Sequence, residues 1–358
     1  MLQLSSPIMQ PSRMLFVPGR LCLFGEHSDW AGAYRSTHPQ IAVGHCLVVG
    51  TDQGVSADFE ARDRVIELTS TLPDGRRIGP QRIEAEPSAL RRAAEAGGFF
   101  SYAAGVALEI AERFGPRGLA LELRADLPIR RGLSSSAALS VLVARAFGRA
   151  HGLALTVREE MEIAYAGERR AGSECGRMDQ ICAFGRRPTY LRFDGERMDI
   201  EPLSARSEIQ LLVVDLRRGK DTRKILADLN RCFPDVSGPL AEAVREGLGR
   251  RNAEIAARAR GALVDGNGPA LGRLMTEAQS VFDRLVAPAC PELRAPRLHE
   301  VLAHAAALDL AWGGKGVGSQ GDGCAQLVAR SPVARAELAR RLEQELDVGC
   351  LPLTIRPS

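Results

Sequence analysis

The 358-residue sequence lacks the features that mark membrane, secreted and nucleic-acid-binding proteins. No apolar run reaches about 18 residues, the length that an α-helix needs to cross a bilayer. The first residues, MLQLSSPIMQPSR, lack a basic segment followed by a long apolar one, so we expect no secretory signal and no membrane partner. The 47 basic and 44 acidic residues are interspersed and leave a net charge of +3, so we expect no nucleic-acid partner.

Cysteine usage indicates a reducing compartment. The eight cysteines are scattered and form no CxxC pair, which is typical of free thiols in a cytosolic chain of this size. Hydrophobic residues make up 45% of the sequence and charged residues 25%, as in soluble globular proteins. We therefore expect a cytoplasmic protein.

The order of apolar runs predicts an α+β protein with two lobes. Strand-like runs at residues 15–24, 45–49, 65–68 and 119–123 precede helices at 137–150 and from Thr156, where Thr156 and Glu159 form a capping box. Two more strand-like runs follow, at 189–193 and 209–214, and residues 238–308 are mainly helical. Domains usually contain about 100 to 200 residues, so we expect two, over residues 1–204 and 205–358.

A Gly-Ser loop, LPIRRGLSSSAAL at residues 127–139, precedes a predicted helix. Backbone N–H groups at a helix start lack internal partners and carry partial positive charge, so the position suits a polyphosphate. Gly132 permits backbone angles that other residues avoid, and the hydroxyls of Ser134, Ser135 and Ser136 can cap the helix or contact a magnesium ion. A Ser-rich helix cap without a ligand is the alternative.

Two further motifs lie near the ends of the chain. The segment PGRLCLFGEHSDWAGAY, residues 18–34, gathers one arginine, one glutamate, one histidine and one aspartate beside an apolar strand. The segment WGGKGVGSQGDGCAQL, residues 312–327, contains six glycines and one lysine. With these three motifs in this order, the chain resembles the GHMP kinases, named for galactokinase, homoserine kinase, mevalonate kinase and phosphomevalonate kinase, and is most similar to the galactokinase-like sugar kinases.

The resemblance implies a fold and two cofactors. The N-terminal lobe would resemble domain 2 of ribosomal protein S5, and the C-terminal lobe would be ferredoxin-like. ATP would bind the Gly-Ser loop, at Gly132, Leu133, Ser134, Ser135, Ser136 and Ala137. Mg²⁺ would be held by Ser136 and by a glutamate that relatives place five residues before a loop glycine. Here Glu168 stands only four residues before Gly172, so either a one-residue deletion restores its role or Glu168 is a solvated helix residue.

The segment ECGRMDQ, residues 174–180, supplies the implied catalytic base. Its CGRMDQ is close to the galactokinase sequence CGIMDQ, in which the matching aspartate faces the sugar hydroxyl. We therefore expect Asp179 to take the proton from the acceptor. Arg20 is expected as the second catalytic residue, because a guanidinium can orient a carboxylate and offset negative charge. A surface aspartate and a solvated strand arginine are the alternatives.

Acceptor binding is expected at Glu26, His27, Asp29 and Gly176, since carboxylates and imidazoles bind polyhydroxylated molecules. GEH followed by a small residue and Asp resembles the galactokinase GEHTDY, whereas the mevalonate branch has an apolar residue at the position of Asp29. The chain departs from galactokinases at Trp30, where they have tyrosine. A run of positive charges later in the chain contains Arg217, Arg218, Lys220 and Arg223. These residues could face an anionic sugar such as a uronic acid, or they could form a solvated surface.

The glycine loop at residues 318–323 also departs from the family pattern GxGxGG, because it contains Gln320 and Asp322. Asp322 either points away from bound phosphates or contacts substrate hydroxyls. The resemblance as a whole implies an ATP- and magnesium-dependent kinase that converts a monosaccharide into its 1-phosphate. A mevalonate-type or other small-alcohol kinase is the alternative within the family, and a non-catalytic sugar- and nucleotide-sensing protein is the alternative outside it. The sequence gives no indication of the oligomeric state.

Overall fold

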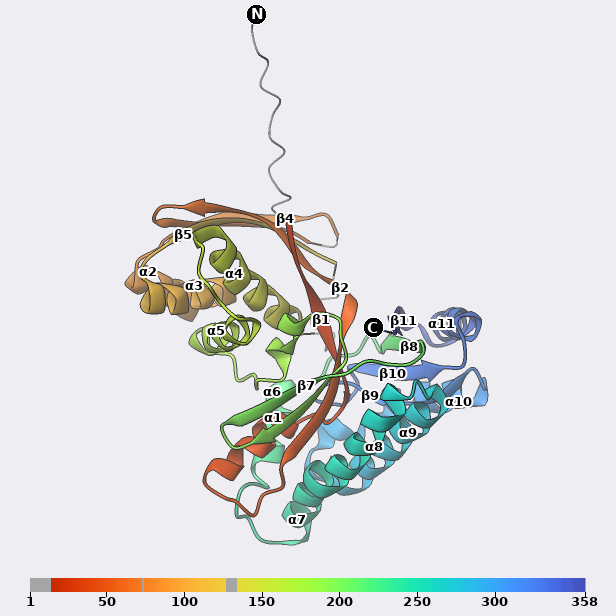
Figure 1. Ribbon diagram of the computed structural model, residues 1–358. Coiled ribbons are helices and arrows are strands. Elements are labelled where there is room, and N and C mark those ends of the chain that lie inside the picture. The colour runs from red at the N-terminus through yellow and green to blue at the C-terminus, as the bar shows by residue number, and fades with distance from the viewer. Residues whose placement is uncertain (1–13, 73, 127–133, 358) are drawn as a thin grey trace, which may run out of the picture. The chain divides into compact units, whose positions relative to one another are not determined.

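The computed structural model describes residues 14–72, 74–126 and 134–357. The chain forms two compact units, each assembled from segments that are distant in sequence (Figure 1). The first unit contains the described residues of Met1–Pro18, Gln53–Leu127 and Ser135–Cys175, and the second contains those of Gly19–Asp52, Pro128–Ser134 and Gly176–Ser358. The expected division into domains 1–204 and 205–358 stays a prediction.

Two long paired strands contribute residues to both units: β1 (Met14–Phe24) and β2 (Gly44–Arg62). The last eight residues of β1 are all buried, which explains why its sequence is mainly apolar, apart from Arg20, and does not alternate with polar residues. Strand β2 changes partner along its length. Its first residues pair with β6 (Thr189–Asp194), and its last residues pair with β5 (Gly118–Ala125).

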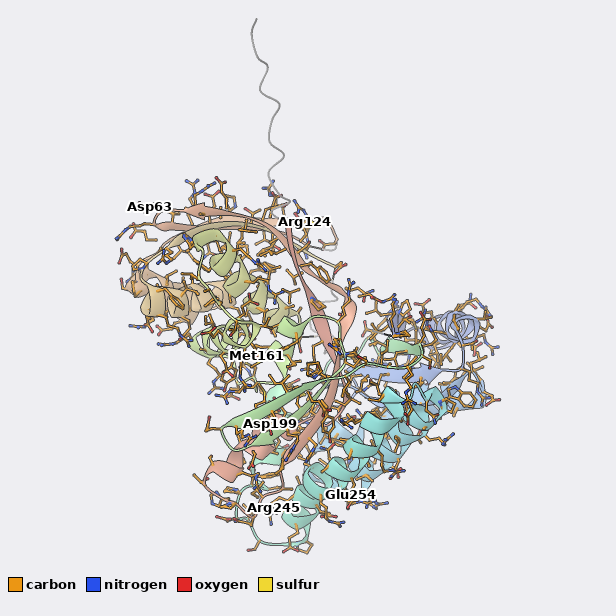
Figure 2. All side chains as sticks on the ribbon, viewed as in Figure 1. Asp63, Arg124, Met161, Asp199, Arg245 and Glu254 are labelled. Atoms are coloured by element: carbon orange, nitrogen blue, oxygen red, sulfur yellow. The ribbon has the colours of Figure 1, made fainter. Side chains whose placement is uncertain are left out.

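In the first unit the strand order is β4-β3-β5-β2. β3 (Val65–Thr71) pairs in parallel with β5 and antiparallel with β4 (Arg77–Glu84). Four helices lie on one face of this sheet in Figure 1: α2 (Pro87–Glu95), α3 (Ser101–Phe114), α4 (Ser135–His151) and α5 (Val157–Arg170). Charged side chains pair across neighbouring strands, such as Arg124 of β5 (labelled in Figure 2) with Asp58 of β2 at 2.7 Å.

Close helix packing in this unit depends on small residues. A Cβ atom on Gly105 of α3 would lie 2.1 Å from the carbonyl oxygen of Gly167 in α5, so the two helices approach through glycine. Met161 of α5, labelled in Figure 2, is fully buried. The predicted capping box starts α5: the Thr156 hydroxyl accepts from the Glu159 amide at 3.2 Å, and the Glu159 carboxylate accepts from the Thr156 amide at 2.7 Å.

The second unit contains a hairpin and a separate four-stranded sheet. β6 forms the hairpin with β7 (Arg197–Pro202), and helix α1 (Ser28–Ala33) packs against β6. The second sheet has the order β11-β8-β10-β9 with antiparallel neighbours throughout: β8 (Ile209–Asp215), β9 (Ala311–Gly316), β10 (Cys324–Ala329) and β11 (Gly349–Ile355).

Six longer helices complete the second unit: α6 (Thr222–Asn230), α7 (Pro239–Glu246), α8 (Asn252–Val264), α9 (Gly268–Leu285), α10 (Pro296–Ala307) and α11 (Pro332–Leu346). α9 and α10 pack against β9, and α11 packs against β8 and β11. The shorter turns are η1 (Tyr34–Ser36), η2 (Asp179–Phe184), the π-helical η3 (Gly247–Arg251), η4 (Ala287–Ala289) and η5 (Pro291–Arg294). Among the helices of the described ranges, none has both the length and the apolarity that a bilayer crossing requires.

The predicted elements are largely present, and the differences have physical causes. The α+β class is confirmed, and α7 to α10 occupy the stretch predicted to be helical. β2 extends beyond the predicted 45–49 to Arg62. The sequence did not predict this later part because it is less buried and contains polar residues, so it has no continuous apolar run. Helices α2 and α3 were not predicted; α2 buries only Leu90 and Ala94, which is too few apolar positions to show a period.

Candidate functional site

The predicted Arg20 and Asp179 are brought together in the second unit. Arg20 lies on β1 and is 4% exposed, and Asp179 is the first residue of the 3₁₀ turn η2. The Arg20 Nη2 atom forms an ion pair with Asp179 Oδ1. The Asp179 side chain remains 27% exposed, so a molecule outside the chain can reach this carboxylate.

Two nitrogen atoms of the Arg20 guanidinium do not take part in the ion pair. Its Nε and Nη1 atoms are buried and have no hydrogen-bond partner among the described residues. A guanidinium has five N–H donors in a fixed fork, and buried donors without partners are costly, so they indicate a group that the chain itself does not supply. An anion beside Asp179 would satisfy them.

Asp29 lies against the segment that leads to Asp179. Its Oδ2 atom is 3.4 Å from the Met178 amide, and its Oδ1 accepts from the Trp30 amide at 3.0 Å. Burial raises the pKa of Asp29, and these amides and the charge of Arg20 oppose that effect. A Cβ atom on Gly176 would lie 1.8 Å from Asp29 Oδ2. The structure thus gives Gly176 a clear task, which is to leave room for the Asp29 carboxylate.

Glu26 is already paired within the protein. Its Oε1 atom accepts from the Nζ atom of Lys315, on β9, and both side chains are almost fully buried. Lys315 also donates to the Gly316 carbonyl at 2.9 Å. Lys315 is the single lysine of the glycine-rich segment 312–327, and its carboxylate partner is Glu26.

His27 is held in one orientation and kept neutral. Its φ of 70° lies in the left-handed region at the start of α1, and its ring stacks on Phe282 at 6.3 Å between centroids. The Trp30 Nε1–H donates to His27 Nδ1 at 3.1 Å, which places the ring proton on Nε2. Burial lowers the pKa of His27 to about 3, helped by the charge of Lys220. The Nε2 atom is buried and makes no hydrogen bond to a described residue.

The departures in the loop at 318–323 also have structural explanations. Asp322 Oδ1 accepts from the Leu298 amide at 2.9 Å, in the first turn of α10. This contact favours the first of the two alternatives, in which Asp322 points away from phosphates. Gln320, with φ 64°, turns its side chain inward and is only 2% exposed. A Cβ atom on Gly316 would lie 2.1 Å from Gln320 Oε1, so the glycine makes room for the inserted glutamine.

The candidate phosphate and metal residues belong to a different part of the chain. Gly132 and Leu133 lie outside the described residues. Ser134 has φ 53°, Ser135 and Ser136 begin α4, and Ala137 is fully buried. Glu168 is fully buried near the end of α5, which packs on α4 within the first unit. A serine hydroxyl and a carboxylate are oxygen ligands of the kind that Mg²⁺ prefers, so these residues fit the ion.

A cavity of about 760 Å³ in the second unit contains none of the predicted site residues. It is lined by the segment around Ile41 and by α7 and η3. Arg245 and Arg250, at its wall, are already bonded within the protein, the first to backbone carbonyls and the second to Glu246 and Glu254.

Sequence reasoning missed the partnership of Glu26 with Lys315 and the tautomer control by Trp30. The only available signal for the first was the single lysine among six glycines at residues 312–327. A buried cation needs a partner, but the sequence does not tell which of 44 acidic residues provides it. For Trp30, the spacing of three residues from His27 on a short helix was the available signal.

Comparisons with known proteins support the family resemblance. Residues 101–186 match the family model described as GHMP kinases N terminal domain. A curated galactokinase of Glaesserella parasuis serovar 5 is 27% identical in an alignment 196 residues long, which covers 52% of this chain and 46% of that protein. The chain thus matches about half the length of this curated relative.

Solved structures extend the likeness over the whole fold. The structure of Lactococcus lactis galactokinase complexed with galactose aligns with a TM-score of 0.72 at 16% identity, covering 96% of this chain and 93% of that one. Methanococcus jannaschii mevalonate kinase aligns with a TM-score of 0.71 at 15% identity, covering 98% and 100%. The predicted resemblance and the predicted fold class are therefore confirmed. At these identities the likeness establishes the fold and does not distinguish between acceptors.

Proposed function

We propose, from the premise that this chain has the motifs and the fold of the GHMP kinases, that it transfers the γ-phosphoryl group of ATP to a hydroxyl of a monosaccharide. The acceptor position we propose is the anomeric hydroxyl, which gives a sugar 1-phosphate. The observation that carries the proposal is the pairing of buried Arg20 with the partly exposed Asp179, with two guanidinium nitrogens left over.

In this proposal Asp179 Oδ2 takes the proton from the acceptor hydroxyl as its oxygen attacks the γ-phosphorus. The ion pair with Arg20 orients Asp179, because the planar guanidinium holds a carboxylate in a fixed geometry. The unpartnered Nε and Nη1 donors of Arg20 face negative charge that grows on the transferred phosphoryl oxygens. Phosphoryl transfer asks a protein mainly for such positioning and charge stabilisation.

Nucleotide binding would fall to the start of α4. Ser134, Ser135, Ser136 and Ala137 would offer backbone amides and hydroxyls to the phosphates, together with Gly132 and Leu133. Ser136 and Glu168 would hold Mg²⁺. When bound, this ion neutralises charge on the β- and γ-phosphates.

Acceptor hydroxyls would contact Asp29 and His27. Asp29 is fixed by the Trp30 amide and can accept from sugar hydroxyls. His27 can donate through Nε2 in its neutral form. A buried aspartate suits a polyhydroxylated acceptor better than an apolar alcohol, because it needs hydrogen-bond donors to satisfy its lone pairs.

The test is a substrate screen with a matched pair of variants. Purified protein is incubated with ATP, Mg²⁺ and a panel of aldoses, uronic acids, deoxysugars and mevalonate; ADP release is measured, and the phosphorylated carbon is identified by NMR. Asp179→Asn should lower kcat by about 10²- to 10⁴-fold, the usual worth of a general base, while ATP affinity survives. The control is Asp194→Asn, an exposed aspartate of β6 that pairs with Arg35.

Three results would contradict the proposal or part of it. Turnover of Asp179→Asn within tenfold of the native rate would remove the residue from its role. Phosphorylation of mevalonate but of no sugar, unaffected by Asp29→Ala, would favour the small-alcohol kinase. Calorimetric binding of nucleotide and sugar without ADP release would favour a sensing protein.

A further inference from the structure

Lys220 is placed unlike its neighbours in the charge run at residues 217–223. Arg217 is more than half exposed and pairs with Asp347, and Arg218 and Arg223 are exposed. Lys220 instead turns inward just before α6, where its Nζ atom donates to the carbonyl oxygens of Gln320 at 2.8 Å and Val317 at 3.2 Å. The structure therefore separates one inward lysine from a solvated surface.

The glycine loop at 318–323 is shaped around this lysine. A Cβ atom on Gly323 would lie 2.9 Å from Lys220 Cε and 3.1 Å from its Nζ. Atoms of Lys220 are also the near neighbours of Gly318 and Gly321. The Thr222 and Ser319 hydroxyls lie 3.2 Å apart and join the start of α6 to the same loop. The Lys220 side chain thus lies in space that the glycines of this loop leave open, and we call this space the Lys220 track.

Lys220 has no carboxylate partner among the described residues. The carboxylate whose charge acts on it is Glu26, which already pairs with Lys315, and the Cys324 thiol acts on it as well. Burial lowers the pKa of Lys220 to about 8, so the ammonium is still largely present at neutral pH. The ammonium groups of Lys220 and Lys315 and the carboxylate of Glu26 leave one positive charge in excess, and the third N–H of Lys220 has no acceptor among the described residues. A half-buried cation of this kind is stabilised when an anion joins it.

The second donor next to this charge is His27. Both side chains lie against the same loop: the Ser319 backbone lies beside the His27 ring, and Lys220 Nζ donates to the carbonyl oxygens of Val317 and Gln320 on either side of it. The Trp30 contact puts the proton on Nε2, which lies beside the Ser319 backbone and makes no well-aligned hydrogen bond to a described residue. A neutral imidazole N–H and an ammonium N–H can together bind the two oxygens of a carboxylate.

We propose that the acceptor carries a carboxylate, which Lys220 Nζ and His27 Nε2 bind. This inference rests on the proposed function, and it changes the substrate class from a neutral sugar to an anionic one, a uronic acid first. The carboxylate supplies the missing countercharge of Lys220, while Asp29 remains available for hydroxyls. Charge-assisted hydrogen bonds of this type are about twice as strong as neutral ones.

The experiment compares each uronic acid with the neutral hexose of the same ring stereochemistry: galacturonate with galactose, and glucuronate with glucose. We expect the native protein to prefer the uronate of one pair by tenfold or more in kcat/KM. Lys220→Met should raise KM for that uronate by about 10- to 100-fold, the worth of a hydrogen bond to a charged group, with kcat nearly unchanged. KM for the neutral hexose should rise much less than KM for the uronate in this variant, and its urea unfolding curve reports whether the protein is folded.

The control is Lys224→Met, which removes an exposed lysine of α6 that pairs with Asp228; it should leave both KM values unchanged. Calorimetry of uronate binding to native and Lys220→Met protein separates recognition from turnover. Uronate binding that depends on Lys220 but is not accompanied by ADP release would support the carboxylate site and refute the proposed kinase activity. Two results would overturn the carboxylate site without contradicting the proposed kinase activity. One is turnover of neutral hexoses with no preference for a uronate, and the other is an equal KM for the uronate in the native and Lys220→Met proteins.

A carboxylate can also come from a hydroxy acid without a ring. Mevalonate is therefore included as a second anionic acceptor. If mevalonate replaces the uronates as the Lys220-dependent substrate, the carboxylate site stands and the sugar is excluded. If mevalonate and the uronates are both insensitive to Lys220→Met, the site is refuted.

Discussion

The buried pair of Lys315 and Glu26 yields a stability prediction that can be worked out in detail. Lys315→Met would leave the Glu26 carboxylate in a place where its side chain is 6% exposed. Removing one partner of a buried ion pair typically costs about 3–5 kcal/mol, because the remaining charge has lost its partner and its water. Lys220 is close enough to interact with Glu26, so we expect the lower end of that range.

The two other variants of the cycle complete the test. Glu26→Gln leaves the Lys315 ammonium, which is 3% exposed, without a countercharge, although the amide oxygen and the Gly316 carbonyl can still accept from it. We therefore expect a loss in the same range of about 3–5 kcal/mol. The double variant removes both charges and should be more stable than the sum of the single losses predicts by several kcal/mol, since neutral replacements of buried pairs are often tolerated.

Urea unfolding followed by tryptophan fluorescence is the suitable assay. The chain has two tryptophans, Trp30 and Trp312, and both belong to the unit that contains the pair. The matched control is Arg258→Met, which breaks an exposed pair with Glu277 and should cost at most about 1 kcal/mol. A Lys315→Met protein within 1 kcal/mol of the native stability, or single losses that simply add in the double variant, would refute the reasoning.

Two further predictions concern the acceptor site. Gly176→Ala would place a methyl group 1.8 Å from the present position of Asp29 Oδ2, so Asp29 must move; KM for the acceptor should rise at least tenfold, while ATP affinity, measured by calorimetry, stays the same. Raising the pH through about 8 should neutralise Lys220 and raise KM for a uronate, and this rise should vanish in Lys220→Met; a native KM that is flat from pH 7 to 9 would contradict it. The titratable groups that act on Lys220 or lie in its field are Glu26, His27, Lys315 and Cys324.

Local sequence signals predicted the local parts of this molecule well. The capping box at Thr156 and Glu159 depends on residues three apart, and the structure contains both of its hydrogen bonds. The apolar run of β1 and the helical stretch of α7 to α10 likewise depend on neighbours in sequence. The roles of the site residues stay predictions, although Arg20 and Asp179 do meet.

Long-range relations could not be predicted. Glu26 and Lys315 are separated by 289 positions, and the sequence contains no periodicity that links them. The track of Lys220 depends on glycines 98 to 103 residues later, at positions that also fit a phosphate-side loop. The charge run at 217–223 illustrates the limit: its four cations look alike in sequence, and only burial separates Lys220 from the rest.

The sharing of β1 and β2 between the two units has a practical consequence for anyone who wishes to cut the chain. A fragment of residues 205–358 would lack the Cys22 carbonyl that accepts from Gln326 at 2.8 Å, and it would carry Lys315 without Glu26. Both side chains that lose a partner are buried: Lys315 lies on β9, an edge strand of the second sheet, and Gln326 lies on β10. Expression of that half alone should therefore yield insoluble material, whereas co-expression with residues 1–204 can restore both partners by complementation.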